Sequence, residues 1–336
     1  MTDLALTFYS VLRMPIADLI HCARAAEKAG FAYISVAESF YRDGPALAAA
    51  LASSTREVRF GTSVFPIYTR TPFQLAMAMA TLHEISRGRI GYLGLGVGYR
   101  SRLESYFGIK IEHPRARMRE YVEIIRLLLS GRDATYRGRF FQFNGFPKLV
   151  ERPLNIPIYF GSSGSRMLQL AGEVADGVIL NSIPTPEHIQ HAKRMVKQGA
   201  EKAGRDPAKV TIASSVIYSV ADNLEEAAKA AKEDILFYLG YPEVTPMLEQ
   251  SGFLEEAQAV RTAYRDGGKE KALGMISQRM LDSLSIHGDT ARCRARLGDL
   301  VKAGLDLPII RVSNVPYGER EKKRVFLRAI ESLRNF

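Results

Sequence analysis

The stretch Arg89–Arg100 reads RIGYLGLGVGYR and joins an apolar strand pattern to a run of glycines. These glycines are Gly91, Gly94, Gly96 and Gly98. A dinucleotide-binding fingerprint has the spacing GxGxxG and opens directly into a helix whose amino end faces the pyrophosphate. Here the spacing is GxGxG, and the next strong helical pattern is expected only near Arg115. The stretch therefore argues against a Rossmann fold and predicts a buried strand whose end leaves bare backbone against another group.

Short β-branched runs alternate with longer segments of helical period on both sides of this stretch, a pattern typical of parallel strands joined by helices. The expected strands are Leu4–Ser10, Tyr33–Glu38, Val58–Phe65, Arg89–Gly96, Ile158–Ser162, Gly177–Asn181, Val210–Ser219 and Ile309–Ser313. Eight strand and helix pairs predict a TIM (β/α)8 barrel, with a doubly wound open sheet as the alternative. Residues 130–157 and 238–287 do not fit the repeat, so we expect a hairpin and a helical insertion within one domain spanning residues 1–336.

Composition allows such a fold, because 336 residues with 46% hydrophobic and 24% charged side chains can bury a large core. No apolar run approaches the roughly 20 residues of a membrane span, and Met1–Asp3 lead directly into the first strand. We therefore expect a cytoplasmic protein that does not bind membranes. Cys22 and Cys293 are the two cysteines, and their separation supports neither a disulfide framework nor a zinc site.

The formal net charge of +10 raises the possibility of a nucleic-acid partner. The basic residues are scattered among acidic ones along helical segments such as Glu319–Arg324, a pattern typical of solvated helix faces. We therefore expect no nucleic-acid partner, and note that the same surplus favours a small polyanionic ligand.

In a barrel of this kind the chemistry lies at the carboxyl ends of the strands. After the second strand, VAESFYRDG places Glu38 and Ser39 near Arg42 and Asp43. A carboxylate there can act as an acid or base, or can simply hold Arg42 while Asp43 caps the next helix. After the third strand, GTSVFPIYTRTP either presses the backbone of Ser63 and Val64 against a flat ligand or makes a tight strand exit.

The strongest phosphate signal is the turn YFGSSGSRM after the fifth strand. It contains Gly161, Ser162, Ser163, Gly164 and Ser165 directly before a helical pattern. Backbone amides at a helix start, joined by hydroxyls, make an anion site, although serines also act as ordinary helix caps. His188 and His191 fall at i, i+3 on one expected helix, but the sequence offers no further ligands for a metal site, so structural roles are expected. No GxSxG elbow points to a serine hydrolase.

Four segments together resemble the luciferase-like monooxygenase superfamily, in the branch that uses the deazaflavin coenzyme F420 and includes methylenetetrahydromethanopterin reductase. They are AAEKAGFAYISVAES, VRFGTSVFPIYTRTPFQLAMAMATLHEISRGRIGYLGLGVG, PIYFGSSGSRMLQLAGEVADGVILNS and SIHGDTARCRARLGDLVKAG. The resemblance covers nearly the full chain. It implies a TIM barrel with a flavin or deazaflavin at the strand ends, and a non-prolyl cis peptide at Ser63–Val64 against the cofactor ring.

By the same resemblance, the cofactor cleft would be lined by Ser39, Ser63, Val64, Gly94, Gly96 and Gly98, with the cofactor phosphate on Gly161, Ser162, Ser163, Gly164 and Ser165. Glu38 is the expected catalytic group. Sugar-phosphate dehydrogenases of this branch carry an Asp-His pair where this chain has Glu38 and Ser39, and a Glu where it has Tyr99. Methylenetetrahydromethanopterin reductases carry a Glu where it has Thr7.

The resemblance implies an oxidoreductase, without a metal, that moves a hydride between C5 of reduced F420 and a small organic substrate. The alternative is an FMN-dependent monooxygenase, in which reduced flavin activates oxygen. A cofactor-binding protein without catalysis is a further possibility from another class. A homodimer through the small-residue helix PFQLAMAMATLHEI is also expected.

Overall fold

The computed structural model describes residues 2–9, 13–38, 40–313 and 318–336. Within them, eight parallel strands close into a barrel. These are β1 (Ala5–Phe8), β2 (Tyr33–Val36), β3 (Arg59–Thr62), β5 (Ile90–Gly96), β8 (Ile158–Gly161), β9 (Gly177–Leu180), β10 (Thr211–Val220) and β12 (Leu307–Val312). Each strand pairs with the next in parallel register, and β12 pairs with β1 to close the ring. The TIM-barrel expectation is confirmed.

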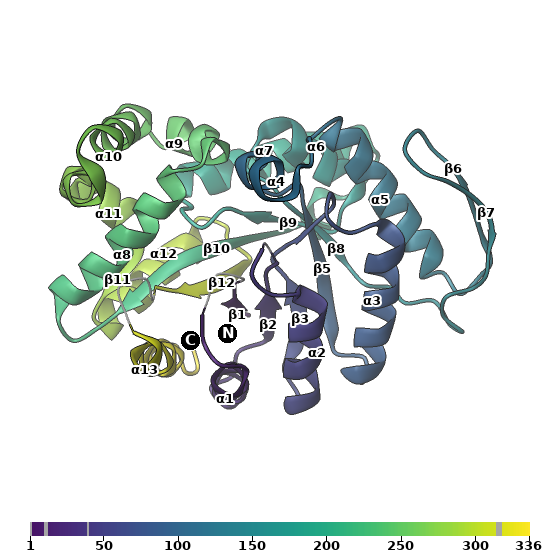
Figure 1. Ribbon diagram of the computed structural model, residues 1–336, viewed down its shortest axis with the longest axis horizontal. Helices are drawn as coiled ribbons and strands as arrows, with labels where there is room; N and C mark the ends of the chain where they lie inside the picture. The colour runs from purple at the N-terminus through teal and green to yellow at the C-terminus, as the bar shows by residue number, and fades with distance from the viewer. Residues whose placement is uncertain (1, 10–12, 39, 314–317) are drawn as a thin grey trace.

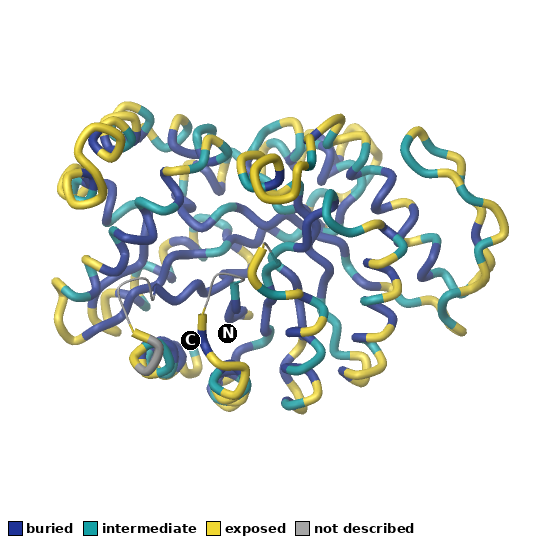
Figure 2. The backbone as a smooth tube through the Cα atoms, in the orientation of Figure 1, coloured by how far each residue is buried: buried dark blue, intermediate teal, exposed yellow. Residues whose placement is uncertain are grey.

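Helices surround the strands (Figure 1). They are α1 (Ile16–Lys28), α2 (Gly44–Ser54), α3 (Pro72–Ile85), α5 (Pro114–Leu128), α6 (Ser165–Val174), α7 (Pro186–Lys202), α8 (Leu224–Leu239), α12 (Thr290–Lys302) and α13 (Glu319–Ser332). Local sequence fixes several of the starts. Asp43 caps α2 by accepting from the amide of Ala46, and Thr71 with Gln74 forms a capping box at α3. Figure 2 shows the buried strands in the centre and exposed residues along the outer helices.

One helix was not expected. α4 (Arg100–Phe107) begins directly after the glycine run, so the prediction that the next helix starts near Arg115 is wrong. The helix has eight residues and buries only Leu103, so it lacks the apolar stripe that makes a helix visible in a sequence. It ends at Gly108 in the left-handed conformation.

The two segments that do not fit the strand and helix repeat contain elements of their own. The first contains the antiparallel hairpin β6 (Ala134–Arg137) and β7 (Gln142–Phe146), which projects from the barrel (Figure 1). The second contains η2 (Pro242–Val244), α9 (Thr245–Gln250), α10 (Leu254–Met275) and α11 (Gln278–Leu284), followed by β11 (Ile286–Gly288), which pairs with β10. These helices pack with α8 around an apolar cluster of their own. The short elements β4 (Phe65–Pro66) and η1 (Pro207–Lys209) complete the described structure.

Aromatic side chains fill the barrel interior. Tyr92 stacks on Tyr159 with ring centroids 4.7 Å apart, and its hydroxyl donates to Ser35 Oγ at 3.0 Å. Gly61 makes room for this ring, because a Cβ there would lie 2.2 Å from Tyr92 Cζ. The interior is therefore closed at this level, and the open space lies beyond the carboxyl ends of the strands. No helix among the described residues is long and apolar enough to cross a membrane.

Candidate functional site at the barrel mouth

A cavity of about 510 Å³ opens at the carboxyl ends of the strands, within the usual ~300–1,000 Å³ of ligand sites. Of the expected site residues it is lined by Glu38, Ser63, Val64, Gly96, Gly98, Gly161, Ser162, Ser163 and Gly164. Gly94 and Ser165 lie outside this lining, and Ser39 lies outside the described residues. The barrel thus brings together residues from four separate strand ends.

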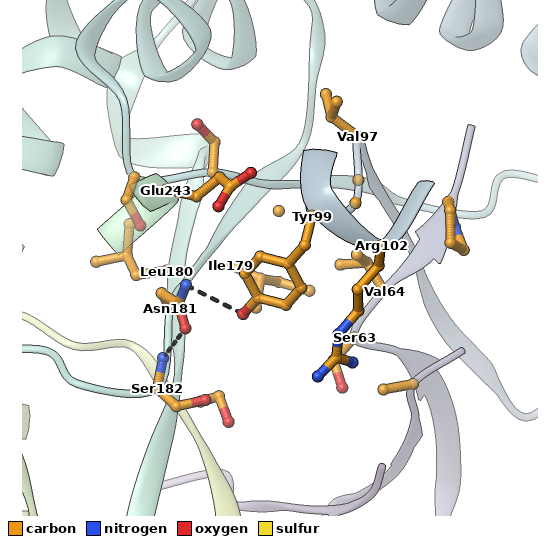
Figure 3. A pocket seen from close by; sticks show the side chains of 18 of the residues that line it. Ser63, Val64, Val97, Tyr99, Arg102, Ile179, Leu180, Asn181, Ser182 and Glu243 are labelled. Carbon is orange, nitrogen blue, oxygen red and sulfur yellow. Dashed lines mark hydrogen bonds between the residues drawn. The ribbon is translucent and has the colours of Figure 1, made fainter. Parts of the chain in front are cut away.

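The peptide bond between Ser63 and Val64 is cis, as expected. The Val64 side chain lies where two glycines leave space for it. A Cβ on Gly96 would come within 2.4 Å of Val64 Cγ2, and one on Gly161 within 2.9 Å of Val64 Cγ1. The glycines that end β5 and β8 therefore seat Val64 at the cavity wall (Figure 3).

Gly94 has a different environment. Its backbone N–H donates to Thr62 Oγ1 at 2.8 Å, and Thr62 Oγ1 donates to its carbonyl at 2.9 Å. A Cβ on Gly94 would lie 2.0 Å from the Thr62 carbonyl oxygen. Gly94 therefore allows β3 and β5 to approach closely and packs below the cavity rather than lining it.

The GSSGS turn leads into α6, whose first backbone amides have no partner within the helix. Ser162 Oγ accepts the amide of Gly164 at 3.2 Å, which shapes the turn. Ser165 Oγ lies 3.0 Å from His191 Nε2 on α7 and is thereby tied to the neighbouring helix. Free amides and a positive helix end beside the Ser162 and Ser163 hydroxyls fit an anion such as a phosphate.

The Glu38 carboxylate is bound by donors from the protein itself. Arg70 Nε donates to Oε1 at 2.8 Å and Arg70 Nη2 to Oε2 at 2.9 Å, and the amide of Gly44 donates to Oε2 at 2.5 Å. Arg70 also pairs with Asp43, the cap of α2. The sequence suggested that Arg42 would be held by these carboxylates. Arg42 instead donates to the Met14 carbonyl, and Arg70 takes that place.

Tyr99 and Asn181 also line the cavity, although the sequence did not single them out as site residues (Figure 3). Asn181 Nδ2 donates to the Tyr99 hydroxyl at 3.4 Å, and Asn181 Oδ1 accepts from the amide of Ser182 at 2.7 Å. Burial raises the pKa of Tyr99, and the neighbouring Tyr238 adds to this, so its hydroxyl stays neutral. Asn181 directly follows β9, and this strand-end position is the signal in the sequence that could have identified it.

Two arginines of the lining are held by protein groups. Arg311 at the end of β12 contacts Asp234 of α8 at 2.7 Å, and its guanidinium lies 4.2 Å from the Tyr9 ring centroid. Arg102 of α4 lies 4.8 Å from the Phe40 ring centroid and 4.9 Å from that of Tyr241. Both cations therefore build the cavity wall. Among the described residues no cluster of His, Cys, Asp and Glu has the makings of a metal site.

A family model described as Luciferase-like monooxygenase matches residues 5–307. The chain belongs to the luciferase-like monooxygenase family. It is 33% identical over 317 residues to the 5,10-methylenetetrahydromethanopterin reductase of Methanolobus tindarius, covering 93% of this chain and 94% of that relative. It is 34% identical over 316 residues to the enzyme of the same name from Archaeoglobus fulgidus, covering 92% and 93% of the two chains.

The fold of this luciferase-like protein is similar to that of the coenzyme F420-dependent tetrahydromethanopterin reductase from Methanopyrus kandleri. The TM-score is 0.84 at 25% sequence identity, over 99% of this chain and 97% of that one. The expected family is therefore confirmed, and its relatives fall in the expected branch.

Proposed function

We propose that the protein is a coenzyme F420-dependent oxidoreductase that transfers a hydride between the deazaflavin and a small organic substrate. The observation that carries the proposal is the match, over more than nine tenths of the chain, to reductases of which one is named as F420-dependent. The cavity agrees with it, because Val64 and the two glycines beneath it leave a smooth apolar wall next to an anion-binding turn.

When bound, the deazaflavin supplies the hydride chemistry at its C5. The residues of this chain would bind and orient it. Val64 would support one face of the ring, and the turn from Gly161 to Gly164 would hold the phosphate. Helix α4 and the segment after α8 would cover the mouth and exclude water. The contact between Ser165 and His191 would hold the end of this turn against α7.

An FMN-dependent monooxygenase is less favoured, because the relatives at 33% and 34% identity are named as methylenetetrahydromethanopterin reductases and the structure at 25% identity as F420-dependent, whereas an FMN-bound monooxygenase structure matches at 17% identity. One experiment separates the two. The purified protein is mixed with F420 or with FMN, and binding is followed by the quenching of each cofactor's fluorescence. We expect tight binding of F420 and oxidation of reduced F420 by an organic acceptor under anaerobic conditions. Oxygen consumption with reduced FMN in its place would overturn the proposal.

The proposal includes a homodimer, a cytoplasmic location and no nucleic-acid or membrane partner. The outer face of α3 supports the dimer, because Met77 and Ile85 on it are 44% and 39% exposed.

Cys22 and Cys293 are both free and buried, which suits a reducing compartment. The assignment of residues 1–336 to a single domain stays a prediction.

A further inference from the structure

Two carboxylates line the cavity, and they differ in what holds them. Both oxygens of Glu38 are occupied by Arg70 and by the amide of Gly44, so this carboxylate has an arginine and a backbone donor before any ligand arrives. Glu243 lies on η2 in the helical insertion and, among the described residues, has a backbone donor but no arginine or lysine in an ion pair. Its Oε1 accepts the backbone N–H of Arg100 at 2.8 Å.

Within the described residues, Glu243 Oε2 is buried and accepts no hydrogen bond, and no basic side chain forms an ion pair with Glu243. A buried carboxylate oxygen without a hydrogen-bond donor costs free energy unless a ligand or a water molecule donates to it. Figure 3 shows the side chain at the cavity wall beside Tyr99.

The position of this carboxylate is fixed by contacts between the insertion and the end of β5. Besides the bond from the Arg100 amide, the ring of Tyr241 stacks on that of Tyr99 with centroids 4.0 Å apart. Tyr241 and Glu243 are two residues apart in sequence, so the ring stack and the hydrogen bond hold the same segment against the start of α4. This carboxylate is thus held at the cavity wall, where a general acid or base acts, with one oxygen that accepts no hydrogen bond among the described residues.

We propose that Glu243 is the acid and base of the hydride transfer at this site. The inference rests on the proposed function and adds to it the source of the proton. It applies to an acceptor whose electrophilic carbon is bonded to nitrogen or oxygen.

Hydride from reduced F420 forms a new C–H bond at the electrophilic carbon. The electron pair of one carbon–heteroatom bond of that carbon moves onto the heteroatom, which takes the proton of the Glu243 carboxylic acid. The substrate is reduced, F420 is oxidised, and Glu243 is left as a carboxylate that the Arg100 amide stabilises. In the reverse direction the carboxylate takes the proton back.

The test uses the F420-loaded enzyme with acetone and with 5,10-methylenetetrahydromethanopterin as acceptors. Glu243→Gln keeps an oxygen for the Arg100 amide and removes the proton donor. We expect kcat to fall by about 10²- to 10⁴-fold with each acceptor that the wild type reduces, while the Kd for F420, measured by fluorescence quenching, stays unchanged. Glu243→Asp should recover part of kcat, because it restores the acid with a shorter reach.

Glu104→Gln is the matched control. Glu104 contacts the other end of the same residue, the Arg100 guanidinium, at 3.0 Å, but it is exposed and lies outside the cavity lining. This variant should keep the wild-type kcat. If the wild type reduces an acceptor and Glu243→Gln does so equally fast, the role of Glu243 is wrong and the proposed function stands. If the wild type binds no F420 or reduces neither acceptor, the proposed function fails and this inference fails with it.

Discussion

Glu38 Oε1 lies 2.8 Å from Arg70 Nε, and this ion pair joins the loop after β2 to the loop before α3. Asp43 contacts the same guanidinium, so two carboxylates share one arginine. The Glu38 side chain is 8% exposed and that of Asp43 is 53% exposed, so solvent screens the second contact far more than the first. The pair accounts for Glu38 as a residue that holds the cavity wall.

Glu38→Ala should therefore lower the free energy of unfolding by about 1–3 kcal/mol, because it leaves Arg70 and the Gly44 amide without their acceptor. Urea denaturation measures the change. Asp43→Ala, whose exposed carboxylate also caps α2, should cost about 0.5–1 kcal/mol. The prediction that Glu38 is the catalytic group would be supported by a Glu38→Gln variant that keeps its stability and loses kcat by about 10²-fold or more.

Alanine at Gly96 or Gly161 should weaken F420 binding. The new Cβ would meet the Val64 side chain at 2.4 or 2.9 Å, so Val64 must move into the cavity. If the displaced Val64 costs F420 binding the same roughly 1–3 kcal/mol that overpacking typically costs, the Kd for F420 rises by about 5- to 150-fold. Gly298→Ala on α12 is the control, since a Cβ there meets nothing within 4 Å and Gly298 lies outside the cavity lining. Equal affinities for all three variants would mean that Val64 does not contact the cofactor.

The barrel was predictable because each buried parallel strand gives a β-branched run followed by a helical period, and eight such units leave few architectures. The space that the Val64 side chain fills was predictable in part, since the glycines of RIGYLGLGVG and of GSSGS mark the ends of β5 and β8. Gly94 shows the limit of that signal. A glycine that lines a ligand cavity and one that lets two strands approach look the same in a sequence.

The contacts that hold the site could not be predicted because they join distant segments. Arg70 is 32 residues from Glu38, and Arg42 is the nearer candidate by sequence. Glu243 meets the Arg100 amide across 143 residues, and it belongs to an insertion with no strand-end pattern to mark it. Such partners become visible only when the barrel places α4 beside the helical insertion.

His188 should make folding stability depend on pH. Its side chain is buried, with Nδ1 2.5 Å from Gln250 Oε1 and Nε2 without a partner among the described residues. Burial lowers the pKa of His188 from 6.5 to about 4, against the raising effect of Gln250, and the neighbouring His191 lowers it further. The pKa of this imidazole is about 6.5 in the unfolded chain and about 4 in the folded protein. Between about pH 4 and 6.5 the unfolded chain therefore binds the proton more readily, so acid favours unfolding.

We therefore expect the stability to be complete above about pH 6.5 and to fall as the pH drops toward 4, by up to about 3 kcal/mol. Urea midpoints at a series of pH values measure this slope. His188→Gln removes the titrating group and should flatten it. Burial also lowers the pKa of His191, so the His188→Gln variant should keep some dependence of stability on pH, with the same sign. An unchanged slope in His188→Gln would contradict the assignment.

Met77→Glu should convert the proposed dimer to a monomer, because it places a charge on the exposed apolar face of α3. Light scattering during size-exclusion chromatography gives the mass directly. Leu224→Glu is the control, since Leu224 is 50% exposed on α8 and lies away from α3. A wild-type protein of 37.4 kDa in solution would exclude the dimer, and a dimer that survives Met77→Glu would exclude this face.

The ion pair between Arg311 and Asp234 is the most buried of those described, with side chains 4% and 0% exposed. Asp234→Asn should lower the free energy of unfolding by about 3–5 kcal/mol, because it leaves a buried guanidinium without its counter-charge. Asp234→Leu combined with Arg311→Met removes both charges and should restore most of that stability. Arg311 also lines the cavity, so the double variant reports on its role there. If stability returns but acceptor reduction does not, the guanidinium contacts the substrate; if both return, the pair only joins α8 to β12.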